Sequence, residues 1–230
     1  MKPTEIFEKV RKEKRVNLNE IESREVLKYY GIPVVEGIVT NSIEEAVYFA
    51  EKKGYPVVLK IVSRDIIHKT DIGGVITNIK NERDLRDAFN QIIKNVRERA
   101  PKARIDGIFV QKMLPKSPEV IVGGKSDPTF DKVILFGIGG IFVEVFEDVS
   151  FRVIPITLSD AKEMISEIKG SKILMGIRGQ DPVDLKSLAD ILLRTSKMLQ
   201  ENQEIKELDI NPIFAMKKGA VAVDARIIIE

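Results

Sequence analysis

The sequence predicts a mixed α and β protein with two lobes. Apolar residues recur at a spacing that switches between about 3.6 and 2 residues, which indicates helices alternating with strands in the first half. After Pro115 the pattern changes to closely spaced short strands. We therefore expect an α+β fold with a helical extension at residues 1–18, an N-terminal lobe at 19–114 and a C-terminal lobe at 115–230, a length that allows each lobe its own core.

Composition narrows the class of protein. The 37 Lys and Arg residues nearly balance 35 Asp and Glu residues, which disfavours nucleic-acid binding through a broad basic surface. The chain has no apolar run of the roughly 18 residues that a membrane helix needs, no apolar signal segment at its start and no cysteine. We expect a cytoplasmic protein without a membrane or nucleic-acid partner. Charged residues of both signs make up 31% of the chain, which favours a thermophilic source.

Helices and strands alternate through the first half. We expect helices at 3–15, 19–30, 42–53 and 81–99, and strands at 34–40, 56–61, 75–79 and 105–113. Two of these helices end at Gly31 and Gly54. The capping segment Ser42 to Glu45 begins the third helix, and Asn81 begins the fourth. Residues 63–74, SRDIIHKTDIGG, are polar and end in two glycines, which predicts a long loop.

The second half contains more strands. We expect strands at 118–123, 131–136, 141–146, 149–154, 205–215 and 220–228, and helices at 159–168 and 184–200. The last helix carries an apolar stripe typical of a core-facing helix, formed by Leu185, Leu188, Ala189, Leu192 and Leu199.

Two common nucleotide motifs are excluded. The segment Gly124-Lys125-Ser126 resembles the end of a P-loop, but Glu119 stands where the leading glycine is required. The run from Gly137 to Gly140 resembles a dinucleotide fingerprint, but Phe142 occupies the third glycine position.

The loop at 63–74 contains His68, the sole histidine of the chain. Any step that needs an imidazole near neutral pH therefore has one candidate, although a lone histidine is more often structural. Its neighbours Arg64, Lys69 and Thr70 can bind an anion. We expect the backbone N–H groups of Gly73-Gly74 to approach phosphate oxygens. An imidazole beside an anion site indicates phosphoryl transfer.

Further residues are candidates for nucleotide binding. Lys60 ends a predicted strand and can reach the same phosphates, although such a lysine is often plain surface. The boundary between the lobes is suited to adenine, through backbone hydrogen bonds and contact with Met113; its residues are Gln111, Lys112, Met113 and Leu114. Glu119 and Glu144 are candidates for a second metal ion or a ribose, or are simply solvated.

The C-terminal segment predicts a hairpin with a metal site. A symmetric turn centred between Lys217 and Lys218 places Asn211 opposite Asp224, and Asp209 opposite Arg226. Directly opposed side chains have Cβ atoms roughly 4.5 to 5.5 Å apart, which lets an amide oxygen and a carboxylate share a cation. Oxygen donors without a second histidine or a cysteine favour Mg²⁺ over zinc. A bulge at the turn would spoil this pairing, and a polar outer face of an edge hairpin is the alternative.

Period two also gives the first strand of this hairpin a polar face. Glu207, Asp209 and Asn211 share that face, and Leu208 and Ile210 lie on the other.

Six segments together resemble one known family. They are SRDIIHKTDIGGV, QKML, the run from Pro118-Glu119 through FGIGGIFVEVFEDVSFRVIP, MGIRGQDPVDL, ELDINP and VDARI. In this order they resemble the ATP-grasp β subunits of ADP-forming acetyl-CoA synthetases, over nearly the whole chain from about residue 19. One departure is Phe130-Asp131-Lys132, where a glycine and a proline are expected after the phenylalanine.

The resemblance implies an ATP-grasp fold, in which two α+β lobes clamp ATP or ADP with Mg²⁺. It implies that His68 carries a phosphoryl group and that Asp209 orients it or accepts its N–H. It also implies that four residues lie near phosphates, namely Lys60, Gly73, Gly74 and Val75, and that Arg178 holds phosphate. The segment Gln111 to Leu114 is implied to surround adenine. Asn211 and Asp224 are implied to bind magnesium.

The resemblance further implies a partner. No CoA domain is recognised in the sequence, so we expect a CoA-binding α subunit that carries the acyl site, in an α2β2 assembly. Two alternatives remain open: an ATP-grasp ligase that joins a carboxylate to an amine without a phosphohistidine, and a non-catalytic module that senses ATP or ADP.

Overall fold

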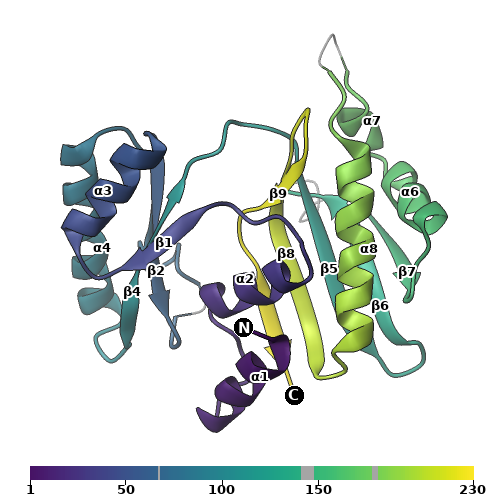
Figure 1. Cartoon of the computed structure of the whole chain (residues 1–230), viewed down its shortest axis with the longest axis horizontal. Coiled ribbons are helices and arrows are strands. Elements are labelled where there is room, and N and C mark those ends of the chain that lie inside the picture. The colour runs from purple at the N-terminus through teal and green to yellow at the C-terminus, as the bar shows by residue number, and fades with distance from the viewer. Residues whose placement is uncertain (67, 141–147, 178–180) are drawn as a thin grey trace. The chain divides into compact units, whose positions relative to one another are not determined.

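The chain forms two compact units in the computed structural model, which describes residues 1–66, 68–140, 148–177 and 181–230. One unit comprises Met1–Val34 and Lys116–Glu230, and the other comprises Val35–Pro115 (Figure 1). Among the described residues, no helix combines the length and apolar character needed to cross a membrane.

The N-terminal segment differs from the expected lobes. Residues 19–34 were expected in the N-terminal lobe, but they belong to the same unit as residues 116–230. The reason lies in packing and pairing: Phe7 and Leu27 are buried in the core of that unit, and the Leu18 N–H donates to the Ile227 carbonyl at 3.0 Å.

The unit Val35–Pro115 is a four-stranded antiparallel sheet with two helices. Its strands have the order β1-β4-β2-β3. Their bounds are β1 (Gly37–Thr40), β2 (Val57–Ser63), β3 (Val75–Ile79) and β4 (Ile105–Lys112), and the helices are α3 (Ile43–Lys53) and α4 (Glu82–Arg99). Strand β2 pairs on both sides and is buried along its whole length, and its Leu59 and Ile61 pack with Leu85 and Ile92 of α4 in one core.

The other unit is built on a larger antiparallel sheet with the order β10-β8-β5-β6-β7, in which β9 also pairs with β8. The strands are β5 (Glu119–Asp127), β6 (Asp131–Ile138), β7 (Val149–Val153), β8 (Ile205–Ala215), β9 (Ala220–Ala222) and β10 (Arg226–Ile229). Its helices are α1 (Pro3–Lys12), α2 (Glu20–Tyr29), α6 (Leu158–Glu167), α7 (Ser171–Leu174) and α8 (Leu185–Glu201).

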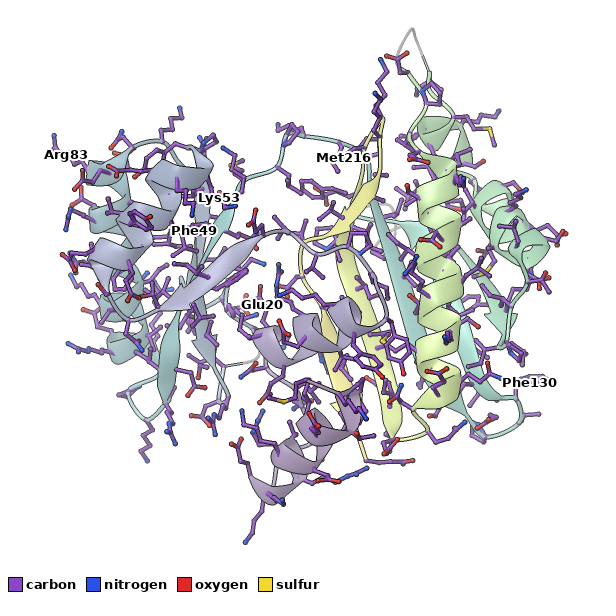
Figure 2. All side chains as sticks on the ribbon, viewed as in Figure 1. Glu20, Phe49, Lys53, Arg83, Phe130 and Met216 are labelled. Carbon is purple, nitrogen blue, oxygen red and sulfur yellow. The ribbon has the colours of Figure 1, made fainter. Side chains whose placement is uncertain are left out.

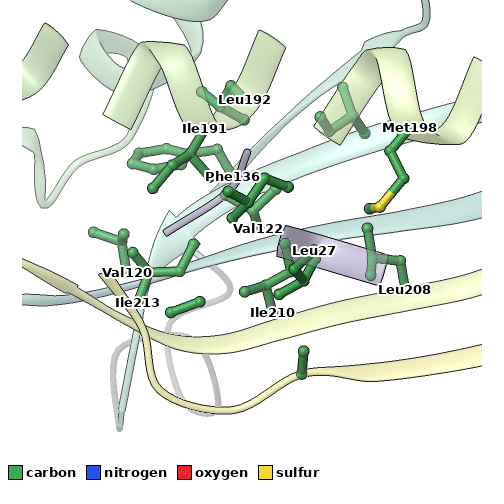
Figure 3. Packing of buried hydrophobic residues seen from close by; sticks show 14 of the residues in the cluster. Leu27, Val120, Val122, Phe136, Ile191, Leu192, Met198, Leu208, Ile210 and Ile213 are labelled. Atoms are coloured by element: carbon green, nitrogen blue, oxygen red, sulfur yellow. The ribbon is translucent and has the colours of Figure 1, made fainter. Parts of the chain in front are cut away.

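Helix α8 covers one face of this sheet, as the apolar stripe predicted. Its Ile191, Leu192 and Met198 lie against the face that carries Val122 and Phe136 (Figure 3). All five side chains are at most 1% exposed. Full burial of each such side chain stabilises the fold by roughly 1.5–3 kcal/mol. The opposite face of the sheet is not covered by α8.

One expected strand cannot be compared, one helix is additional, and one expected strand is divided. The strand expected at 141–146 lies outside the described residues. Helix α7 was not expected, because its four residues are too short for a periodic pattern. The strand expected at 220–228 is divided into β9 and β10, because its partner β8 contains Pro212, which has no N–H to donate.

The departure at Phe130-Asp131-Lys132 has a structural use. Lys132 is 2% exposed, and its Nζ donates to the carbonyls of Leu199, Asn202 and Gln203 at 3.2, 2.7 and 3.2 Å. These carbonyls lie at the C-terminal end of α8, where backbone acceptors lack partners within the helix. Burial lowers the pKa of Lys132. The lysine thus ties the start of β6 to the end of α8, close to the turn that carries Phe130 (Figure 2).

Candidate functional site

The loop that carries His68 is anchored at both ends within its unit. At the first end, Arg64 Nε donates to Asp106 at 3.1 Å and the Arg104 N–H donates to Asp65 at 2.7 Å. His68 lies between the anchors and is exposed. It is therefore accessible to solvent.

Helix α4 holds the second end of the loop. Asn95 Nδ2 donates to the Gly73 carbonyl at 2.9 Å, and Arg99 donates to the Asp71 carbonyl at 3.2 Å. The N–H groups of Gly73 and Gly74 donate to the carbonyls of Thr70 and Lys69 at 3.0 and 2.8 Å.

The reason we expected for the two glycines is therefore wrong: their N–H groups are not open to phosphate but close the turn. Gly73 has φ +66°, and a Cβ there would lie 2.5 Å from Asn95 Nδ2. At Gly74 a Cβ would lie 2.6 Å from Ile61 Cγ2. Both positions need glycine because of conformation and close packing.

Lys60 lies in the middle of a sheet rather than on its surface. It is 6% exposed and pairs with Val75 of β3 on one side and with Phe109 of β4 on the other. The next residue, Ile61, donates its N–H to the Gly74 carbonyl at 2.7 Å. The structure therefore brings Lys60, Gly74 and Val75 together, and a lysine buried this far is rarely a plain surface residue.

In the segment from Gln111 to Leu114, two backbone N–H groups have partners within the protein and one side chain has an open acceptor. The N–H groups of Lys112 and Met113 donate to the carbonyls of Glu36 and Pro56 at 3.3 and 3.1 Å. Lys112 Nζ donates to the Gly54 carbonyl at 2.7 Å, which makes it a structural tie. Gln111 is 3% exposed, and its Oε1 is buried without a hydrogen-bond partner in the structure.

The predicted register of the C-terminal hairpin is confirmed. Ile213 pairs with Ala222 and Ala215 with Ala220, and the Met216 N–H closes the turn on the Gly219 carbonyl at 3.1 Å (Figure 2). In the same register Asp209 pairs with Arg226.

The register continues where β9 is interrupted. The Asn211 N–H donates to the Asp224 carbonyl at 3.2 Å, and the Val223 N–H donates to the Pro212 carbonyl at 2.9 Å. Asn211 and Asp224 therefore lie opposite each other, as expected. The irregularity of this hairpin falls at Ile228 and Ile229 rather than at the turn.

A bulge that the sequence did not reveal lies beside these two residues. On β5, Val120 pairs with Ile213 and Val122 pairs with Ile210, so Asn211 and Pro212 together oppose the single residue Ile121. A bulge reverses which face later residues of a strand occupy. Leu208 and Ile210 are buried as predicted, but beyond the bulge Ile213 and Ala215 are buried instead.

Asp209 lies in a hollow of about 440 Å³ on the sheet face opposite α8. The hollow is lined by residues of β5, β6, β7, β8 and β10, among them Lys125, Phe151, Glu207 and Arg226. Although Asp209 reaches solvent, the protein atoms around it raise the pKa of its carboxyl; Arg226 opposes this rise and Asp224 adds to it. Asp209 is therefore a better proton acceptor than an ordinary aspartate.

Asp224 is supported by a residue that sequence reasoning missed. Arg24 of α2 is 3% exposed and donates to the Val223 carbonyl at 3.2 Å. Burial lowers the pKa of Arg24, and the negative charges of Glu20, Asp224 and Glu25 counteract that fall. The spacing of Glu20 and Arg24 on a helix was a visible signal, but it also fits an ordinary surface pair.

The remaining candidates are less defined. Glu119 begins β5 and is exposed, and its carbonyl accepts the Gly139 N–H at 2.7 Å. Glu144 and Arg178 lie outside the described residues. No cluster of three His, Cys, Asp or Glu side chains suited to a metal ion occurs in the part of the chain that the structure describes. The pair of Asn211 and Asp224 instead offers one amide and one carboxylate, a donor set suited to a cation that keeps other ligands.

Comparison with known proteins decides the family. Residues 9–229 match the family model for the ATP-grasp domain. The chain belongs to the ATP-grasp family. The expected α+β ATP-grasp fold is thereby confirmed.

Among ATP-grasp proteins, the chain resembles one group of ligase subunits. It is 53% identical to the β subunit of ADP-forming acetate–CoA ligase I of Pyrococcus furiosus, over 99% of this chain and 98% of the relative. It is 48% identical over 89% of its length to ADP-forming acetate–CoA ligase I of Archaeoglobus fulgidus, of which it spans 30%. The expected membership in this group is confirmed.

Solved structures of an acetyl-CoA synthetase from Candidatus Korarchaeum cryptofilum also match. One, with coenzyme A, acetyl-coenzyme A and a phosphorylated phosphohistidine segment, has a TM-score of 0.90 and 43% identity, covering 99% of this chain and all of that one. Another, with coenzyme A and Mg-AMPPCP, has a TM-score of 0.87 and 42% identity over 99% of this chain and all of that one.

Proposed function

We propose that this chain is the nucleotide-binding subunit of an ADP-forming acetate–CoA ligase, which converts acyl-CoA, ADP and phosphate to the free acid, CoA and ATP. In this role it passes a phosphoryl group between ADP or ATP and a partner subunit through His68. The observation that carries the proposal is the single, exposed histidine in a loop anchored at both ends. The relatives of nearly equal length, one of which has a phosphorylated phosphohistidine segment, support it.

The nucleotide is proposed to bind to a buried side-chain acceptor and a buried lysine of the unit Val35–Pro115. The buried Gln111 Oε1 accepts a hydrogen bond, which suits the amino group of adenine. Lys60, beside Gly74 and Val75, supplies positive charge for phosphate oxygens. Met113, Leu114 and Glu119 are proposed around the base and ribose. Lys112 is proposed to contact the base through its backbone, because its Nζ donates to the carbonyls of Gly54 and Tyr55.

The magnesium ion is proposed to lie on Asn211 and Asp224. Two observations support this pair: the Asn211 N–H bonds the Asp224 carbonyl on the facing segment, and the two side chains carry an amide oxygen and a carboxylate, both of which Mg²⁺ accepts. When bound, the ion neutralises phosphate oxygens during transfer.

The transfer itself is proposed to occur on an imidazole nitrogen of His68. In the direction from ATP, that nitrogen forms a bond to the γ-phosphorus while the bond from phosphorus to the bridging oxygen of ADP breaks. The imidazole loses its N–H proton, for which we propose Asp209 as the acceptor, since its raised pKa favours proton binding. The reverse step returns the phosphoryl group to ADP.

The partner is proposed to be a CoA-binding α subunit that holds the acyl site, in an α2β2 assembly. The β-subunit name of the Pyrococcus relative supports a partner. The Archaeoglobus relative, in which the counterpart of this chain is only 30% of a longer protein, supports further domains acting with it.

The test separates a subunit from a complete enzyme. The purified chain is incubated with acetate, CoA, ATP and Mg²⁺, with and without the CoA-binding subunit, and acetyl-CoA is measured. We expect Mg–ADP binding by the chain alone and acetyl-CoA only after the subunit is added. Acetyl-CoA synthesis by the single chain would contradict the proposal, and amide formation from an acid and an amine would favour the ligase alternative.

A further inference from the structure

Helix α2 contains a buried ion pair that the proposed mechanism does not use. Glu20, labelled in Figure 2, is 4% exposed and Arg24 is 3% exposed. Arg24 Nη1 lies 4.0 Å from Glu20 Oε1. Removing two charges from water is costly, so a buried ion pair is weak evidence for a stabilising role. The start of the helix is already capped by Asn19 and Glu22, which bond each other's backbone at 2.9 Å. Another use for the pair is therefore indicated.

Arg24 contacts the hairpin next to the proposed magnesium ligand. Its Nη1 donates to the carbonyl of Val223, in the short segment that separates β9 from β10. The neighbouring Asp224 attracts the same guanidinium electrostatically. The arginine thus acts on the backbone that carries the carboxylate and on the charge of that carboxylate.

Asp224 is held from other directions as well. The Asn211 N–H donates to its carbonyl at 3.2 Å, and the Ala225 N–H donates to its Oδ1 at 2.8 Å. This interrupted strand cannot rely on continuous ladder bonds, because β9 ends at Ala222 and β10 begins at Arg226. The bond from Arg24 replaces part of the lost support.

We propose that Arg24 is a positioning residue for the magnesium site, which fixes the segment Val223-Asp224 while Glu20 offsets its positive charge. This inference rests on the proposed function, in which Asn211 and Asp224 hold the ion. Two effects of Arg24 on metal binding oppose each other. Ordering Asp224 strengthens binding, whereas a cation near a cation weakens it. Glu20 reduces the second effect, so the ordering effect dominates.

A matched control is the ion pair that Glu22 of the same helix forms with Arg15, which lies in the segment before the helix. Arg15 Nη2 lies 2.8 Å from Glu22 Oε1, and this pair is also largely buried. Arg15 further bonds Glu13 and the Asn17 carbonyl, all in the N-terminal segment. Loss of this pair is expected to destabilise the fold without affecting Asp224.

The experiment measures how much magnesium tightens ADP binding. Calorimetry on the full chain gives the ADP dissociation constant in EDTA and in saturating Mg²⁺, and the ratio of the two isolates the metal. D224N is measured first, and the loss of most of the ratio is expected. R24Q is then expected to reduce the ratio about tenfold, as is common for residues that orient a metal ligand. R24K, which keeps the charge but not the forked donor geometry, is expected to lose less.

Each outcome is decisive. An unchanged ratio in D224N overturns the proposed metal site. A normal loss in D224N with an unchanged ratio in both Arg24 variants, even with a lower melting temperature, overturns the positioning role alone. A larger ratio in R24Q would show that Arg24 acts on the metal ion only by charge repulsion, and would also overturn the positioning role. The control R15Q should lower the melting temperature and keep the ratio, and a tenfold loss there would make the effect of Arg24 a general loss of stability.

Discussion

The His68 loop and the C-terminal hairpin are built in opposite ways. The loop is held by a few backbone bonds at its glycine turn and by side-chain bonds at its ends, such as the bond from Arg99 to the Asp71 carbonyl. The hairpin is held by strand pairing on both sides of the gap between β9 and β10, by buried residues such as Ile210 and Ile213, and by the buried Arg24. A phosphoryl carrier must move between sites, whereas metal ligands must keep their geometry. The difference matches the two proposed roles.

The loop side of this comparison has the largest expected effect. H68Q should reduce the overall reaction of the complex with its partner by at least about ten-thousandfold, because no other imidazole exists to take the phosphoryl group. The fold should be unaffected since His68 is exposed. The control is D71N, at an exposed residue of the same loop, which should keep near-normal turnover. Normal turnover by H68Q would show that His68 does not carry the phosphoryl group.

The hairpin side is tested by its two proposed ligands. N211A and D224N should each reduce magnesium-dependent turnover by about a thousandfold, because loss of a ligand removes charge stabilisation of the phosphates. Circular dichroism and melting curves should show a folded protein. Lys217 is the control: it forms an exposed ion pair with Asp181, worth little, so K217A should be near neutral. Normal magnesium dependence in both ligand variants would exclude this site.

Asp209 distinguishes activity from stability within the same hairpin. Its pKa is raised above the ordinary 3.8, so the folded chain holds this proton more tightly than the unfolded chain. Stability from this group is therefore greatest below pH 3.8 and is lost as the pH rises through the raised pKa. D209N has no carboxyl to ionise, so it does not lose stability in this way as the pH rises. It should melt at the same or a higher temperature than the wild type near neutral pH.

The same variant should turn over about a hundredfold more slowly, because the proton acceptor is gone. Melting curves of both proteins from acid to neutral pH, with turnover at each pH, check this pair of effects. A lower melting temperature for D209N at neutral pH would mean that the carboxylate stabilises the fold.

The smallest expected effect concerns the anchor of the loop. In N95D, Asn95 loses the N–H that it donates to the Gly73 carbonyl, and a net hydrogen bond is worth about 0.5–1.5 kcal/mol. Opening of the loop should rise by roughly 2- to 12-fold, measured as faster tryptic cleavage after Lys69. K94A, on the exposed side of the same helix, should not change cleavage. Equal cleavage rates in all three proteins would show that α4 does not restrain the loop.

The sequence predicted the hairpin well and its irregularities poorly. A symmetric turn between Lys217 and Lys218 was enough to give the pairing of Asn211 with Asp224, because side chains and register in a hairpin follow from the turn. The bulge at Asn211 and Pro212 is defined against β5, which is far away in sequence, so no local pattern reveals it.

The loop shows the reverse. Its residue types indicated a histidine in a long loop, and the structure shows that this histidine is exposed, but the two glycines serve packing against Asn95 and Ile61 rather than open N–H groups. The burial of Lys60 and Arg24 was also missed. Lys60 is buried by neighbouring strands, and Arg24 is buried because α2 packs in the same unit as residues 116–230. The periodicity of one segment carries no information on such distant contacts.

Direct detection of the phosphoryl group on His68 tests the central claim most directly. The full chain with its partner subunit is incubated with γ-labelled ATP and Mg²⁺, and the peptide containing His68 is examined by mass spectrometry and for acid-labile, base-stable label. The account predicts label on His68 in the wild type, none in H68Q, and slow labelling in N211A and D224N. Turnover by a complex whose His68 never becomes labelled, or label that persists on this chain in H68Q, would contradict it.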